Sequence, residues 1–285
     1  MLSPALDASI QTLDNSEVSG LRFYVAREQL GTPILLLHSI NAAASSMEMA
    51  PLFEHFRASR PVYSLELPGF GQSDRLDQIY TPQLYAQAIA DMAAAIPEGP
   101  PDIVALSLTC EFVARADRDH GLRYRSLSMI SPTGFSARTP PGEVFSRRME
   151  KVLGTPLLGR GLFAALTTRP SIRFFLGKAF VGETPARLID YALETARQPG
   201  AHHAPFAFLS MRLFSADALA SYAQLNQPAL ILYDQDPNIG FDRLPELLAS
   251  QARVSVERIS PSLGMPHWEQ IDATVSALQE FWQSI

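Results

Sequence analysis

Cysteine is almost absent from this chain of 285 residues, because Cys110 is the only one. A single thiol excludes an intramolecular disulfide and any metal site built from several cysteines. Long apolar runs are also missing, since segments such as 33–37 and 228–232 fall far short of the roughly 20 residues that span a bilayer. The first residues contain no basic segment followed by an apolar one, so we expect no secretory signal and a cytoplasmic protein.

Lysine is also scarce, with only Lys151 and Lys178 among the 23 basic side chains. The formal net charge of −6 argues against nucleic acid as a partner. The chain has 47% hydrophobic and 18% charged residues and a mean hydropathy of +0.03. These values are typical of a folded globular protein and not of a disordered one.

Short apolar runs alternate with amphipathic stretches along most of the chain. This alternation predicts an α/β fold with a mostly parallel sheet and helices on both of its faces. We expect strands at residues 21–26, 33–38, 62–67, 102–106, 126–131, 228–233 and 254–259. We expect helices at residues 47–57, 82–95, 108–119, 242–251 and 272–282.

The alternation is interrupted at residues 135–214, which contain short helical patterns and no run typical of a strand. This segment predicts a helical cap inserted between strands 6 and 7 of a core made of residues 1–134 and 215–285. It carries 11 basic and 5 acidic residues, a net charge of +6 against −12 for the rest, and nine of the 16 phenylalanines. An insertion so apolar must pack on itself or over a pocket. Within it we expect helices at residues 142–152, 159–167 and 185–197.

A serine lies where an expected strand ends and a helix begins, in the segment Ala105-Leu106-Ser107-Leu108-Thr109. Small residues two positions before and after a serine resemble the G-x-S-x-G nucleophile elbow, which holds the serine on a sharp, strained turn. Here Ala105 and Thr109 stand in place of the usual glycines. On this fragment alone, a serine at an ordinary strand-to-helix turn is an equal interpretation.

Two later segments supply the partners that a serine nucleophile needs, a base and an acid that orients it. Asp236 precedes a proline after the expected strand 228–233, and His267 follows the last expected strand. The alternative interpretation makes Asp236 a turn residue and His267 a packing or capping residue. The neighbouring Asp234 is expected to be a solvated turn residue.

These motifs together resemble the α/β-hydrolase superfamily, in its capped group with a serine triad. The resemblance extends to the segments 38–41 and 66–74, the second of which matches a D-x-P-G-x-G-x-S turn with glutamate in the first place. It implies a triad of Ser107, Asp236 and His267. It also implies an oxyanion hole made by the backbone N–H groups of Ile40 and Leu108. No cofactor is implied, and the histidines show no spacing typical of a metal site.

The resemblance does not choose the substrate, because this fold serves many reactions. We expect hydrolysis of a carboxylic ester or thioester with an apolar acyl group. Two alternatives stay open, a carbon–carbon bond hydrolase with the same triad and a ligand-binding protein without catalysis. The cap cations either pair with acids of the core or rim the pocket and attract an anionic substrate. The cations in question are Arg147, Arg148, Lys151, Arg160, Arg169 and Arg173.

Overall fold

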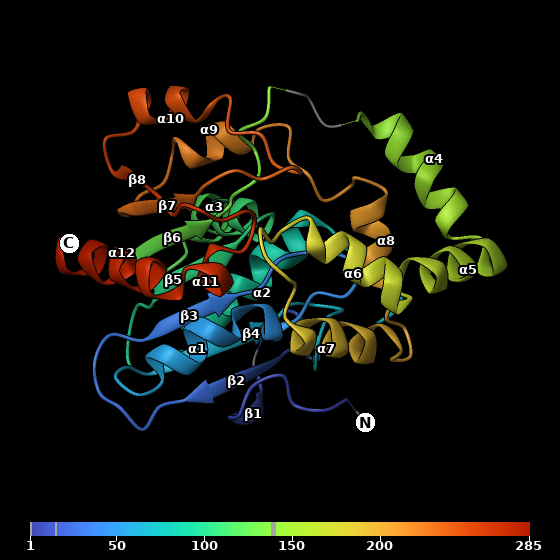
Figure 1. The fold of residues 1–285 in the computed structure, drawn as a ribbon, viewed down its shortest axis with the longest axis horizontal. Helices are drawn as coiled ribbons and strands as arrows, with labels where there is room; N and C mark the ends of the chain where they lie inside the picture. Colours follow the sequence, from blue (N-terminus) through green and yellow to red (C-terminus); the bar gives the residue numbers. More distant parts are fainter. Residues whose placement is uncertain (1, 15, 138–140) are drawn as a thin grey trace.

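The computed structural model describes residues 2–14, 16–137 and 141–285. They form one sheet of eight strands in the order β1-β2-β4-β3-β5-β6-β7-β8 (Figure 1). β1 and β2 pair antiparallel and β2 joins β4 antiparallel, whereas all other pairs are parallel. The strands are β1 (Ser9–Thr12), β2 (Arg22–Ala26), β3 (Ile34–Leu37), β4 (Val62–Glu66), β5 (Asp102–Leu106), β6 (Ser126–Ile130), β7 (Ala229–Tyr233) and β8 (Val254–Arg258).

The predicted α/β fold is confirmed, and each of the seven expected strands is present within one residue at either end. The eighth, β1, was not expected. Its four residues, Ser-Ile-Gln-Thr, are mostly exposed at the edge of the sheet, so no buried face marks them as a strand in the sequence.

Helices cover both faces of the sheet (Figure 1). The alternating side chains of each strand explain why both faces are apolar. In β3, Leu35 and Leu37 join one core cluster with residues of α2 and α3, whereas Ile34 and Leu36 join a second with residues of α1 and α12. The helices of the core are α1 (Ala50–Phe56), α2 (Pro82–Ala95), α3 (Thr109–His120), α10 (Leu244–Ser250), α11 (Pro266–Glu269) and α12 (Ile271–Gln283), with a 3₁₀ helix η1 (Ser46–Met49) before α1.

The described part of the chain between β6 and β7 forms helices and no strand, as expected for the insertion. Most of these helices lie together at one end of the molecule, on the right in Figure 1. They are α4 (Glu143–Leu153), α5 (Pro156–Leu166), α6 (Arg169–Gly177), α7 (Ala186–Ala196), α8 (His203–Leu209) and α9 (Ala218–Tyr222). The bounds 135–214 of a separate cap stay a prediction. Among the described residues, no helix combines the length and the hydropathy that a bilayer crossing requires.

The register of the parallel strands brings several chain segments to one edge of the sheet. Leu37 pairs with Ala105, and Ala105 pairs with Met129, so β3, β5 and β6 end side by side. The loops that follow these strands begin near Ser39, Ser107 and Ser131. The carboxyl ends of parallel strands are the usual place of a ligand site in this type of sheet.

Candidate active site

Ser107 lies directly after β5 in a backbone conformation that is rare for a residue with a side chain. Its φ is 57°, in the left-handed region that costs a non-glycine residue about 1–3 kcal/mol. The turn is held by the Ser107 N–H, which donates to the Ile130 carbonyl at 2.8 Å. Thr109, in place of the usual glycine, is fully buried and its hydroxyl donates to the His38 carbonyl at 2.7 Å. The substitution is therefore compatible with the sharp turn that the sequence predicts.

A cavity of about 430 Å³ opens in front of Ser107. The strand ends supply one wall and the insertion helices supply the other. Side chains from the strand ends and the following loops are Ser39, Ile40, Asn41, Leu106, Ser107, Leu108, Ser131, Thr133 and Asp236. Side chains from the insertion are Leu166, Ile172, Phe175, Leu176, Lys178, Ala179, Leu188, Ala192, Phe208, Leu209 and Phe214. The insertion wall is thus apolar except for Lys178.

Ile40 and Leu108, the expected oxyanion residues, both line this cavity. The loop that carries Ile40 is held by the buried Glu48, whose carboxylate accepts from the Ser39 N–H at 2.8 Å and from Asn41 Nδ2 at 2.6 Å. Burial raises the pKa of Glu48 and the hydrogen bonds from Ser39 and Asn41 oppose this shift. Because a negative charge here would oppose an oxyanion on the same loop, the raised pKa suits the expected role of the Ile40 N–H.

Asp236 also lines the cavity, where its Oδ1 accepts from the Asn238 N–H at 2.7 Å. Gly264 lies opposite: a Cβ added to it would be 2.8 Å from Asp236 Oδ2 and 3.3 Å from the Ala179 Cβ. Gly264 therefore packs directly against Asp236. A residue with a side chain would fit at position 264 only if the Asp236 carboxylate moved.

Among the described residues, His267 and Ser107 form no hydrogen bond with each other. The His267 side chain is fully buried in α11, and its Nε2–H donates to the Glu48 carbonyl at 2.8 Å. The Trp268 Nε1–H donates to the same carbonyl at 2.7 Å, so the α11 turn is fixed against η1. His267 is not among the residues that line the cavity, its Nδ1 has no hydrogen-bond partner, and burial lowers its pKa to about 4. The role of His267 as base stays a prediction, one that requires the ring to leave Glu48.

Gly264 is the residue at this site that the sequence did not point to. A glycine carries no chemical group, and only the three-dimensional arrangement shows that its Cβ direction points at Asp236. The local reason is the four-residue helix α11, which turns His267 toward η1 and leaves Gly264, three positions earlier, at the cavity wall.

A model of the alpha/beta hydrolase family matches residues 34–277. The chain belongs to this family. Over 257 residues it is 21% identical to the biotin biosynthesis bifunctional protein BioHC of Cellvibrio japonicus, with 82% of the chain aligned to 45% of that protein. The chain thus spans less than half of the length of this curated relative.

Solved α/β hydrolases share the fold of this chain. The His-tagged serine hydrolase CarC, involved in carbazole degradation, superposes with a TM-score of 0.77 over 98% of the chain and 100% of its own length, at 14% identity. The 2-hydroxy-6-oxo-6-phenylhexa-2,4-dienoate hydrolase of Rhodococcus sp. strain RHA1 gives 0.71 over 92% and 94%, at 16% identity. At such identities the likeness concerns the fold alone.

The expectation that Asp234 is a solvated turn residue of this α/β hydrolase is wrong. Its side chain is buried, and its carboxylate accepts from Arg258 Nε at 2.7 Å and from the Ser262 N–H at 3.0 Å. Burial opposes ionisation, but these hydrogen bonds together hold the pKa of Asp234 below its usual range. Asp234 therefore ties the end of β7 to the loop after β8, whereas Asp236 faces the cavity.

We expect Asp234→Asn to lower mainly the stability of the protein and Asp236→Asn to lower mainly its activity. Asp234→Asn removes a charged acceptor from Arg258 and the Ser262 N–H and should lower the free energy of unfolding by about 1–3 kcal/mol. Asp236→Asn should leave stability nearly unchanged and impair turnover. Urea unfolding and ester hydrolysis, measured on both variants, check this assignment. If both variants lost the same activity and kept the same stability, Asp234 would not be the structural residue and Asp236 the one needed for turnover.

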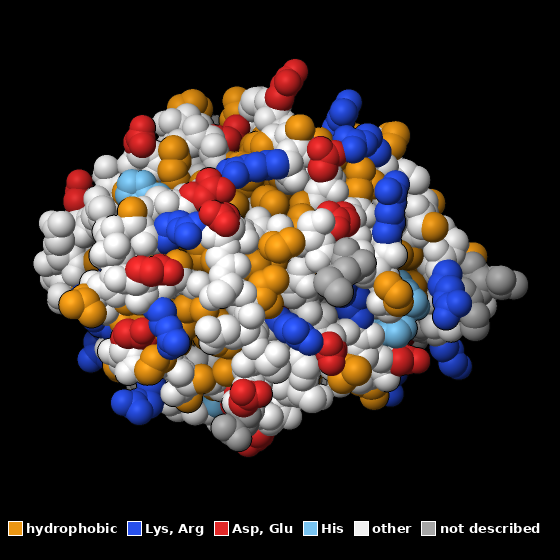
Figure 2. Space-filling model, turned by 90° about the horizontal axis from the view of Figure 1, so that it is seen from below, with side chains coloured by type: hydrophobic (Ala, Val, Ile, Leu, Met, Phe, Trp, Pro, Cys, Tyr) orange, Lys and Arg blue, Asp and Glu red, His pale blue; other side chains and the backbone are white. Residues whose placement is uncertain are grey.

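The six cap cations are exposed on the insertion helices α4, α5 and α6. None of the six lines the cavity, in which Lys178 is the one basic residue among the described lining. Arg147 pairs with Glu143 of its own helix and Arg169 pairs with Asp190 of α7. On the face shown in Figure 2, basic and hydrophobic side chains lie next to one another at the end that carries the insertion. That they rim the pocket and attract an anionic substrate stays a prediction.

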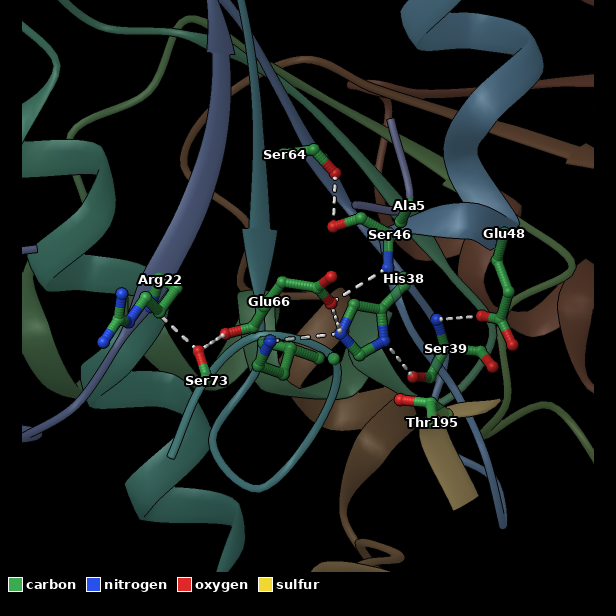
Figure 3. A network of polar contacts seen from close by, with 12 residues as sticks. Ala5, Arg22, His38, Ser39, Ser46, Glu48, Ser64, Glu66, Ser73 and Thr195 are labelled. Atoms are coloured by element: carbon green, nitrogen blue, oxygen red, sulfur yellow. Dashed lines mark hydrogen bonds and ion pairs between the residues drawn. The ribbon is translucent and has the colours of Figure 1, made fainter. Parts of the chain in front are cut away.

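A second polar cluster, around His38 and Glu66, lies next to the start of the loop that carries Ile40 (Figure 3). The His38 Nδ1–H donates to the Ser39 carbonyl at 2.7 Å, and Nε2 accepts from the Leu67 N–H at 3.0 Å. Glu66 accepts from the Ser46 N–H at 3.0 Å, while its Oε1 has no partner. Burial lowers the pKa of His38 to about 4 and raises that of Glu66 to about 7. Although the two side chains lie 3.6 Å apart, these shifts favour the neutral form of both.

The raised pKa of Glu66 predicts a pH-dependent stability that Glu66→Gln removes. Between the unfolded value of 4.5 and the folded value of about 7, the native state keeps a proton that the unfolded state has lost. The contribution of Glu66 is therefore complete below pH 4.5 and is lost as the pH rises to about 7. A shift of this size corresponds to about 3 kcal/mol.

The measurement for this prediction is urea unfolding of wild type and Glu66→Gln at several pH values. The stability of the variant relative to wild type should increase by up to about 3 kcal/mol from acid to neutral pH. Taking the difference cancels the opposite titration of His38 and His267, which are unchanged in both proteins. A difference independent of pH would show that folding does not shift the pKa of Glu66.

Proposed function

We propose that this α/β hydrolase cleaves a carboxylic ester or thioester with an apolar acyl group, through an acyl-enzyme intermediate on Ser107. The observation that carries the proposal is the strained left-handed conformation of Ser107 at the wall of a cavity with apolar sides. Strain of this kind persists where the surrounding structure maintains it and is concentrated at functional sites. The apolar insertion wall suits an acyl chain.

In the proposed mechanism the Ser107 Oγ forms a bond to the carbonyl carbon while a nitrogen base takes the hydroxyl proton. The carbonyl oxygen becomes an oxyanion and accepts hydrogen bonds from the N–H groups of Ile40 and Leu108. The bond to the alcohol or thiol then breaks, and the base returns the proton to this leaving group. A water molecule, activated by the same base, releases the acid and restores Ser107.

Asp236 is the proposed acid that orients the base and stabilises its charged form. His267 is the base that the sequence predicts, and it fulfils this role only if the α11 turn moves its ring from Glu48 to Ser107. The mechanism requires no cofactor.

Two further candidate functions each have an observation in their favour. Carbon–carbon bond hydrolysis with the same nucleophile is favoured by the similarity of fold to a 2-hydroxy-6-oxo-6-phenylhexa-2,4-dienoate hydrolase. Ligand binding without catalysis is favoured by the cavity wall itself, since its described lining contains no histidine.

Labelling with a fluorophosphonate probe, followed by peptide mapping, tests the proposal directly. We expect the label on Ser107. A panel of p-nitrophenyl esters, acyl-CoAs and ring-cleavage ketones then separates the reactions, and we expect the highest kcat/KM for an apolar ester or thioester. Turnover of the ketones alone would favour carbon–carbon cleavage, and tight binding without label or turnover would favour the ligand-binding protein.

A further inference from the structure

We infer that the docking face, which we define as the exposed side chains of residues 143–178 on α4, α5 and α6, binds an anionic lipid surface. The partner is a bilayer with negatively charged head groups. A second part of the inference, that an ester with an apolar acyl chain passes from this surface into the cavity, rests on the proposed function. The docking itself does not depend on Ser107.

The first observation is a concentration of exposed apolar side chains. Of the thirteen large hydrophobic side chains that are exposed among the described residues, seven belong to the docking face. They include Phe145, Phe174 and Phe175, with exposed fractions of 46%, 60% and 51%, which are the three exposed phenylalanines of the described chain. The helices that carry them are neighbours, because α5 contacts both α4 and α6 at the same end of the molecule (Figure 1). An exposed apolar patch of this kind marks an interaction site.

The second observation is the charge of the same face. Residues 143–178 contain seven basic and two acidic side chains, and the two acids, Glu143 and Glu150, each pair with an arginine. Five of the seven basic side chains have no ion-pair partner among the described residues. They are Arg148, Lys151, Arg160, Arg173 and Lys178. Unpaired cations next to apolar side chains suit a surface of negatively charged head groups, since each cation near that surface contributes to binding.

The arrangement of the two kinds of side chain favours a bilayer over a second copy of this chain. In α4, Phe145, Arg148 and Val152 recur at the spacing of one helix face. In α6 the Lys178 Nζ lies over the Phe174 ring, at 4.6 Å from its centroid. A lipid surface accepts such a mixture, because apolar groups enter the acyl layer while long basic side chains reach the head groups. Contact between two copies of this face would bring unpaired cations together.

The third observation connects the docking face with the cavity. Phe175 and Lys178 are exposed and also line the cavity, so the docking face extends to the cavity mouth. On α5 the cavity-lining Leu166 follows the exposed Leu162 by one helical turn. An acyl chain in the bilayer would therefore find an apolar path along α5 and α6 toward Ser107, with little of its surface exposed to water.

Co-sedimentation with vesicles tests the docking without any substrate. The full chain is mixed with vesicles of phosphatidylcholine alone, and with vesicles in which about a third of the lipid is phosphatidylglycerol. We expect at least about 10-fold tighter binding to the anionic vesicles, and weaker binding when sodium chloride is raised from about 0.05 M to about 0.5 M. Equal binding to both vesicles, or binding to neither, would overturn the inference.

Variants of the docking face and matched variants of the core locate the contact. Phe174→Asp should weaken binding to the anionic vesicles by about 10-fold or more, because it removes an apolar ring and adds a repelled charge. The double variant Arg148→Glu, Lys151→Glu should have an effect of similar size through charge alone. Leu30→Asp and Arg123→Glu change exposed residues of the core and should bind as wild type does. Equal losses in both sets would overturn the assignment to this face.

An acidic protein is the alternative partner with the same charge. Polyglutamate is the probe that separates it from a bilayer, because it offers carboxylates without an acyl layer. We expect polyglutamate to bind more weakly than the anionic vesicles, and Phe174→Asp to weaken only the binding to vesicles. If polyglutamate binds as tightly and Phe174→Asp binds the vesicles as wild type does, charge alone determines the contact and the lipid assignment is overturned.

The outcomes separate this inference from the proposed function. Ser107→Ala should bind the anionic vesicles as wild type does. If vesicles bind the chain while Ser107 takes no fluorophosphonate label, the docking stands and the proposed function fails. If Ser107 takes the label and no vesicle binds, the inference fails and the proposed function stands.

The passage of substrate from the lipid surface has a test of its own. A long-chain p-nitrophenyl ester is offered in anionic and in phosphatidylcholine vesicles. We expect several-fold faster hydrolysis in the anionic vesicles, in proportion to the protein bound, and Phe174→Asp should remove the difference. Equal rates in the two vesicles, with more protein bound to the anionic ones, would overturn the entry of substrate from this surface.

Discussion

Alanine in place of Ser107 is expected to abolish labelling by a fluorophosphonate and to lower kcat for an apolar ester on the order of 10³-fold or more. The covalent route depends on one oxygen, and removal of a serine nucleophile typically costs 10⁴- to 10⁶-fold when its base is in place. Substrate binding should be retained, because the apolar wall of the cavity comes from other residues. Hydrolysis by Ser107→Ala at a rate near that of wild type would contradict the proposed function.

Ser107→Gly is the matched control for a fold effect. At a φ of 57° glycine has no side chain to strain the turn, so this variant should be more stable than Ser107→Ala by about 1 kcal/mol and equally inactive. The comparison separates the strain at the turn from the chemistry of the hydroxyl. Equal stability of the two variants in urea unfolding would show that residue 107 is unstrained.

Most of the sheet could be predicted from the sequence because its strands are buried on both faces. Runs such as 34–37 and 102–106 are continuous and short, and turn residues bound them. β1 and the short helices α6, α8 and α9 were missed for a common reason. Each is stabilised by contacts with distant segments more than by a pattern of its own, as in α8, where Ala204 is packed in the main core.

The residues of the candidate site that come directly after a strand could be predicted from the sequence. Ser107 and Asp236 follow β5 and β7, and the parallel register of the sheet brings those ends to one edge. His267 lies nine residues beyond the end of β8, and the path of that connecting loop is determined by tertiary contacts. Asp234 holds the Ser262 N–H, and Glu48 holds the His267 ring, and neither contact leaves a pattern in the sequence.

His267→Ala is expected to lower ester hydrolysis by about 10²- to 10⁴-fold, the usual contribution of a positioned general base. In the proposed mechanism the ring takes the proton of Ser107, for which it must leave the Glu48 carbonyl, to which its Nε2–H donates at 2.8 Å. Hydrolysis by wild type should fall as the pH is lowered through the pKa of this imidazole, because the protonated ring cannot accept a proton.

Urea unfolding of wild type and His267→Ala is the control for a fold effect, since the variant also loses the hydrogen bond to the Glu48 carbonyl. Ser107→Ala and the double variant with His267→Ala should be about equally inactive, since residues that act as one unit are not additive. Hydrolysis by His267→Ala at the wild-type rate and with unchanged stability would show that another group is the base.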